Sequence, residues 1–68
     1  MFYKPNSEYL KDLRLSQFMD QPALGEKIDL TPTTICRIEK GQRMSGITLH
    51  KYADYFTDAD INDMVIRD

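Results

Sequence analysis

The sequence predicts a small all-α domain built from five short helices. Its 68 residues suffice for one domain and no more. Apolar residues recur at intervals of three and four along most of the chain, the spacing that places them on one face of a helix. No segment alternates apolar and polar residues for long enough to indicate a strand, so none is expected.

The first predicted helix begins near residue 7. Ser7 is expected to cap it, because a serine hydroxyl can accept a hydrogen bond from a free backbone N–H of the first turn. Leu10 and Leu13 form its inner edge, and Phe18 and Met19 are expected to close it on the core side.

The second and third predicted helices carry clearer start and stop signals. Asp20 can cap a helix over Gln21–Ile28. Thr31 can cap the third, which has Pro32 at its first position, where a missing N–H costs little, and Gly41 as its end. The inward residues of both helices are apolar: Leu24, Ile28, Ile35 and Ile38.

The last two predicted helices follow the looser segment of residues 41–46. The fourth buries residues spaced i, i+3, i+4, i+7: Leu49, Tyr52, Ala53 and Phe56. The fifth is an acidic helix over residues 58–67, capped by Thr57 or Asp58. One side of it is apolar and is the expected dimerisation surface: Ile61, Met64 and Val65.

Composition and charge narrow the classes of function. No apolar run approaches the roughly 20 residues that span a bilayer, and the N-terminal residues lack the order of a signal peptide. The single cysteine, Cys36, excludes an internal disulfide and fits a reducing compartment, so a cytoplasm is the expected location. Residues 1–53 carry eight Lys/Arg against six Asp/Glu, whereas residues 54–68 carry Arg67 against five aspartates. Any basic surface is therefore expected in the first three quarters of the chain.

The connection between the second and third helices predicts a helix-turn-helix. Only Asp29, Leu30 and Thr31 separate them, and so short a turn forces a steep crossing. Gly25 offers the small residue that such a crossing requires where the two backbones meet. Asp29 stands where the turn calls for a positive φ, which aspartate tolerates better than most residues.

Three segments resemble the Cro/C1 (XRE-type) helix-turn-helix domains of phage repressors and bacterial regulators: "LKDLR", "QPALGEKIDLTPTTICRIEKG" and "ITLHKYADYF". The resemblance covers about residues 10–56 of a single domain over 1–68. It implies a lambda-repressor-like fold that binds an operator in double-stranded DNA, as a possible homodimer. It also implies a structural ion pair between Arg14 and Glu39, which joins the first helix to the third.

The same resemblance implies a set of DNA contacts. Gln21 matches a position that often touches a phosphate, and Thr33, Thr34 and Arg37 match positions that face base edges. Arg37 is the residue best suited to recognise a base, because a guanidinium can donate hydrogen bonds to O6 and N7 of guanine at the same time. Lys40 and Arg43 are expected to hold the phosphate backbone.

Some positions favour a protein partner instead. Pro32 cannot make a polar base contact, and Met44 and Ile47 are apolar where related domains often carry basic or polar residues. The chain also resembles, more weakly and in overall character only, the phage modulator-of-repression (antirepressor) proteins. In that alternative the chain binds a phage repressor protein through Pro32, Arg37, Met44 and Ile47.

No set of residues points to catalysis or to a bound group. The chain has no glycine-rich phosphate loop, and its one histidine, His50, lacks a His or Cys at ligand spacing. We therefore expect no enzyme, no cofactor, no metal site and no small-molecule substrate. The functions left open are a DNA-binding regulator, an antirepressor and, third, an antitoxin or a structural helical module.

Overall fold

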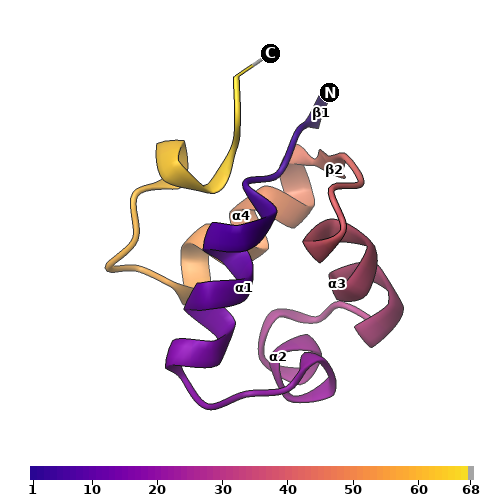
Figure 1. The fold of residues 1–68 in the computed structure, drawn as a ribbon, viewed down its shortest axis with the longest axis vertical. Coiled ribbons are helices and arrows are strands. Elements are labelled where there is room, and N and C mark those ends of the chain that lie inside the picture. The colour runs from indigo at the N-terminus through magenta and orange to yellow at the C-terminus, as the bar shows by residue number, and fades with distance from the viewer. Residues whose placement is uncertain (68) are drawn as a thin grey trace.

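The computed structural model describes residues 1–67 and is mostly helical (Figure 1). The α-helices are α1 (Ser7–Ser16), α2 (Gln21–Ile28), α3 (Pro32–Glu39) and α4 (Gly46–Tyr55). Two short strands, β1 (Phe2–Tyr3) and β2 (Met44–Ser45), and one 3-10 helix, η1 (Ile61–Met64), complete the elements. None of the helices within residues 1–67 has the length and hydrophobicity that crossing a bilayer requires.

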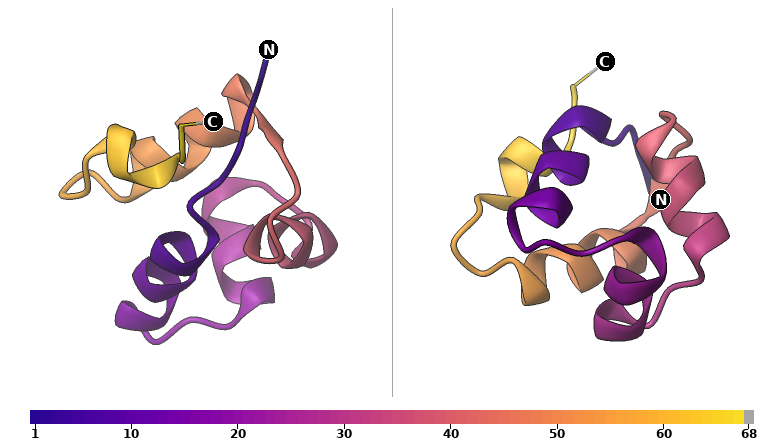
Figure 2. Two further views of the ribbon diagram at one scale, coloured as in Figure 1. Left: turned by 45° about the horizontal axis from the view of Figure 1, so that its top comes forward. Right: turned by 60° about the horizontal axis from the view of Figure 1, so that its bottom comes forward.

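The hydrophobic core lies between the four helices and is closed by η1 and β2 (Figure 2). The helical spacing correctly predicted most of its members, because residues three and four apart share one side of a helix. The buried apolar residues are Leu10, Leu24, Ile28, Ile35, Ile38, Met44, Leu49, Tyr52, Phe56 and Met64.

Two of the four predicted helix caps, Asp20 and Thr31, are confirmed. The Asp20 side chain accepts a hydrogen bond from the backbone N–H of Ala23 at 2.8 Å, and Thr31 accepts one from Thr34 at 3.2 Å. The prediction for Ser7 is wrong, since α1 begins at Ser7 itself. The Ser7 hydroxyl instead donates to the backbone carbonyl of Ile38 at 2.6 Å and so joins α1 to the end of α3.

The C-terminal end of α1 also differs from the prediction. Gln17 ends the helix, and Phe18 adopts a left-handed backbone with φ of 58°. This conformation turns the Phe18 side chain away from the core and leaves it 96% exposed. Only Met19 of the expected closing pair packs against the core.

The strands were not expected from the sequence. β1 and β2 pair antiparallel, with Phe2 opposite Ser45 and Tyr3 opposite Met44. Each strand has two residues, and their partners lie some forty positions away along the chain, so neither leaves an alternating pattern. In the folded chain β1 runs beside the start of α4, with the Tyr3 ring near Gly46 (Figure 2).

The predicted helix over residues 58–67 is wrong. Only Ile61–Met64 is helical, as a 3-10 turn whose cap, Asp60, accepts from the Asn62 N–H at 2.9 Å. The chain then becomes extended, because Val65 pairs with Pro5 and the Ile66 N–H donates to the Lys4 carbonyl at 2.9 Å. Met64 is fully buried, and Ile61 and Val65 are partly buried on the same core, so Met64 is not available for the expected dimer surface.

Candidate recognition surface around α3

The connection between α2 and α3 is tight and well supported. Asp29 has the left-handed backbone predicted for it, with φ of 57°. A Cβ atom at Gly25 would collide with the Leu30 carbonyl oxygen, so the expected close approach of the two backbones is present. The Lys51 ammonium of α4 donates to the Asp29 carbonyl at 2.8 Å, which ties the connection to the body of the domain.

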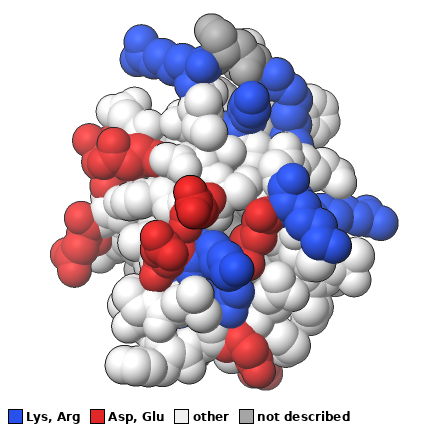
Figure 3. Space-filling view, in the orientation of Figure 1, with Lys and Arg blue, Asp and Glu red and all other residues white. Residues whose placement is uncertain are grey.

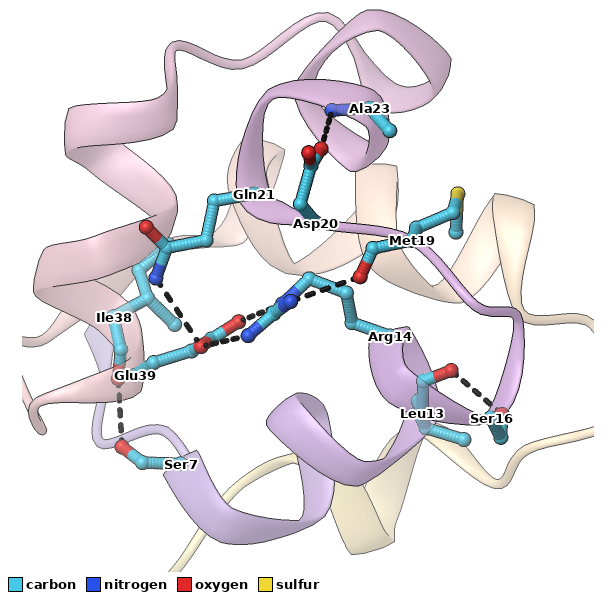
Figure 4. Close-up of polar contacts among 10 residues, drawn as sticks. All are labelled: Ser7, Leu13, Arg14, Ser16, Met19, Asp20, Gln21, Ala23, Ile38 and Glu39. Carbon is cyan, nitrogen blue, oxygen red and sulfur yellow. Dashed lines mark hydrogen bonds and ion pairs between the residues drawn. The ribbon is translucent and has the colours of Figure 1, made fainter.

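The predicted pair between Arg14 and Glu39 is confirmed (Figure 4). The guanidinium donates from Nε to Oε2 at 2.8 Å and from Nη2 to Oε1 at 2.9 Å, a two-pronged contact that holds both side chains in one plane. Their side chains are only 9% and 6% exposed. The hydrogen bond to Glu39 raises the pKa of Arg14, against the opposing effect of burial, so the arginine stays charged.

Further polar contacts gather around this pair. Arg14 also donates to the Met19 carbonyl at 2.9 Å, and the Gln21 amide donates to Glu39 Oε1 at 3.3 Å (Figure 4). Together with the bond from Ser7 to Ile38, they fasten the C-terminal end of α3 to α1 and α2. The inner side of α3 is thus held firmly, and its outer side is left to face outward.

The outer side of α3 brings most of the predicted site residues together. Thr33, Arg37 and Lys40 are exposed, as is Pro32. They line a shallow depression of about 360 Å³ together with Cys36 and Gln21. Gln21 therefore lies beside the predicted base-facing residues, although its amide also bonds Glu39.

A second depression of about 200 Å³ lies between α3 and β2. Arg37 lines both depressions and forms the ridge between them. The second one also brings in two further predicted residues, Thr34 and Arg43. We call the combined area the α3 surface, defined by Gln21, Pro32, Thr33, Thr34, Arg37, Lys40 and Arg43.

The two apolar residues proposed for partner binding separate in the structure. Met44 is only 3% exposed, because β2 pairs with β1 and turns this side chain into the core. Its expected role as an exposed partner contact is therefore wrong. Ile47 is 74% exposed at the start of α4, but it lines neither depression.

Sequence reasoning missed Phe2 and Gln42, which also line the second depression. Phe2 is 67% exposed. It reaches this place only through the pairing of β1 with β2, and no local signal in the sequence marks that pairing. Gln42 follows the helix-ending Gly41 and belongs to no periodic segment, so its position could not be predicted.

The α3 surface is basic although the chain as a whole carries a net charge of −2. Arg37, Lys40 and Arg43 are exposed, whereas the acidic Glu39 is neutralised by Arg14. Figure 3 shows Lys and Arg side chains gathered over α3 and the chain ends, and Asp and Glu side chains over the side of η1 and the loop before it. The α3 surface is therefore locally basic, while the side of η1 and the loop before it is locally acidic.

Comparison of the chain with protein-family models, with curated proteins and with solved structures finds no match. Within residues 1–67 no group of three or more His, Cys, Asp or Glu side chains is placed to hold a metal ion.

Proposed function

We propose that the chain is a small DNA-binding transcriptional regulator in which α2 and α3 act as a helix-turn-helix. One observation carries this proposal: α3 buries Ile35 and Ile38 and presents Thr33, Arg37 and Lys40 outward on its other side. A short, firmly held helix with polar and basic groups on its free side suits insertion into the major groove of DNA.

Each residue of the α3 surface has a role in this proposal. Arg37 bonds a guanine from its central position between the two depressions. Thr33 and Thr34 lie near base edges, and Lys40, Arg43 and Gln21 bind phosphates. Two copies would reach successive major grooves about 34 Å apart. The two copies would contact each other through residues other than Met64, because Met64 is buried.

A binding titration tests the proposal. Duplexes enriched from a randomised DNA library are titrated at about 50 mM and about 200 mM salt. Arg37→Ala should weaken binding to the best duplex at least about fivefold, because a good two-pronged base contact contributes about 1–3 kcal/mol. The control is Lys27→Ala, an exposed cation on α2 outside the α3 surface. If no duplex is enriched, or if Lys27→Ala weakens binding as much as Arg37→Ala does, the proposal fails.

An antirepressor is the second candidate, and the exposed apolar residues favour it. Phe2, which lines the second depression, is 67% exposed, and Ile47, two residues beyond β2, is 74% exposed. Protein interfaces commonly pair apolar anchors with a polar or charged surround, and the basic residues of the α3 surface offer one. In this proposal the chain binds a phage repressor protein and alters its binding to DNA.

The two candidates predict different effects of one substitution. If the antirepressor proposal holds, Ile47→Asp should weaken the complex with the phage repressor at least about tenfold, since anchor residues often contribute 2 kcal/mol or more. Isothermal titration with the purified repressor measures the affinity. Leu15→Asp is the control, because Leu15 is 49% exposed on α1. An unchanged complex with Ile47→Asp would remove the support for the antirepressor.

A further inference from the structure

A groove runs between the C-terminal half of α1 and the end of α4, away from the α3 surface. Its volume is about 490 Å³, larger than either depression beside α3. We call it the α1–α4 groove. Its lining comes from α1, from the end of α4 and from the loop that follows: Tyr9, Leu13, Ser16, Gln17, Tyr55, Phe56, Thr57, Asp58 and Ala59.

The α1–α4 groove combines two tyrosines with polar side chains, and its aromatic residues are held in place. Tyr9, Leu13 and Tyr55 are half-buried, so each offers part of its side chain to the groove. The Tyr55 ring meets the buried Phe56 ring edge to face, with centroids 5.0 Å apart. Its hydroxyl also lies 3.9 Å from the Met19 sulfur. The Tyr55 wall of the groove is therefore held in place by its neighbours.

The charge that lines this groove is acidic. Asp58 is the one charged residue of the lining, and it is exposed. The segment 54–66 contains four aspartates and no Lys or Arg. Figure 3 shows acidic side chains over this side of the molecule. Aromatic faces beside a carboxylate attract a cation that also has apolar carbon atoms, as arginine and lysine do.

We propose that the α1–α4 groove docks a basic segment of a partner protein. An Arg or Lys side chain of that segment stacks on Tyr55 or Tyr9 and pairs with Asp58, and a neighbouring apolar side chain covers Leu13 and Ala59. Charge complementarity selects this occupant. A second copy that docked symmetrically through the same groove would bring Asp58 against Asp58, and nucleic acid would bring phosphates against the same aspartates.

This site is independent of the function proposed for α3. No residue of the α3 surface lines the α1–α4 groove. The two surfaces carry opposite charge and lie on different sides of the domain, so both can be occupied at once (Figure 3). A protein bound at the groove would then be carried to wherever α3 binds.

The test uses the full chain, labelled with ¹⁵N, and a short acetylated peptide of repeating Ala-Leu-Arg triplets. Amide resonances of Tyr55, Asp58 and Ala59 should shift during the titration, and those of α3 should stay in place. Asp58→Lys should weaken binding about fivefold or more, since it replaces an attraction by a repulsion. Asp63→Lys is the matched control: it makes the same change of charge at an exposed position of η1 outside the groove, and it should change the affinity less than about twofold.

Three results would overturn the proposal. The first is equal binding of a twin peptide with Glu in place of Arg. The second is that Asp63→Lys weakens peptide binding as much as Asp58→Lys does. The weakening would then come from the net charge of the chain and not from a contact with Asp58. The third is an absence of shifts at Tyr55, Asp58 and Ala59 at millimolar peptide. Circular dichroism of both variants verifies that they fold, and both positions are exposed, so folding should be retained.

Discussion

Tyr52 has a hydroxyl group that, within the described part of the chain, is buried without the hydrogen bond that would offset its loss of water. Its side chain is fully buried against the core, and its hydroxyl finds no hydrogen-bond partner among residues 1–67. A buried hydroxyl without a partner costs about 1–3 kcal/mol relative to a satisfied one. Burial also raises the pKa of Tyr52 above its ordinary value of 10, because the phenolate would be far from water.

Tyr52→Phe should therefore stabilise the domain by about 1 kcal/mol at neutral pH, because it removes the hydroxyl and keeps the ring. At alkaline pH the unfolded chain ionises Tyr52 before the folded one does. The free energy of unfolding should thus fall as pH rises above about 10, and Tyr52→Phe should flatten this fall. Urea titrations at pH 7 and at about pH 10.5 measure both effects. Tyr3→Phe is the control, and a loss of stability in Tyr52→Phe would show that the hydroxyl has a partner.

Phe18 is a second residue that local preference does not explain. A left-handed backbone is costly for a bulky residue and is usually given to glycine or asparagine. Here it lets the chain turn sharply from α1 toward α2. The backbone N–H of Phe18 donates to the Leu15 carbonyl at 3.0 Å, and that of Met19 to Arg14 at 3.4 Å. The turn satisfies the end of α1 and brings the Met19 carbonyl to the Arg14 guanidinium.

Among the elements, α3 depends most on contacts from outside itself. It has eight residues, too few to be stable as an isolated helix in water. Its capping threonine and its proline start it, and its apolar side holds it to the core. The Arg14–Glu39 pair and the Ser7 hydroxyl hold its C-terminal end. The orientation of the α3 surface therefore depends on α1 as much as on α3.

Glu39→Ala should lower the free energy of unfolding by about 3 kcal/mol, because it leaves the Arg14 guanidinium buried without its carboxylate. A thermal melt followed by circular dichroism measures the loss. The control is Asp29→Asn, which breaks an exposed ion pair with Lys51 at 3.6 Å and should change the melting temperature little. A melting temperature unchanged by Glu39→Ala would contradict the anchoring role of the pair.

The boundaries of the helices show where sequence patterns are sufficient to predict secondary structure. α2 and α3 match their predicted starts, because Asp20, Thr31 and the following prolines act within a single turn. The helix expected after residue 58 does not form, although apolar spacing and a candidate cap at Thr57 or Asp58 supported it. Aspartate, asparagine, valine and isoleucine favour helices weakly, and residues 65 and 66 obtain backbone partners from Pro5 and Lys4 instead.

At the scale of the whole molecule, the fold separates two surfaces of opposite charge. The basic α3 surface and the acidic α1–α4 groove lie on different sides of one hydrophobic core (Figure 3). The N- and C-terminal segments meet beside β2 through the pairing of β1 and the bridge between Pro5 and Val65. This closure removes Met64 from the surface and leaves any self-association to other residues.

Much of the candidate site could be predicted because it lies on one helix. Thr33, Arg37 and Lys40 share the side of α3 opposite Ile35 and Ile38, and helical periodicity alone puts them there. Gln21 and Arg43 join them from adjoining segments of the chain. The roles of Met44 and Phe2 could not be predicted, because each depends on a strand pairing between residues far apart in sequence.

The local sequence was sufficient to specify α2 and α3 with their caps, the left-handed turn at Asp29 and most of the apolar core, because each follows from interactions within about one or two helical turns. The ion pair between Arg14 and Glu39 was predicted from the family resemblance, which implied that these two positions lie close together in the fold. The burial of Met44 and Met64, the place of Phe2 beside Arg37 and the α1–α4 groove came from the folded chain. These features join segments that are distant in sequence, and packing in three dimensions selects among the arrangements that local preferences allow.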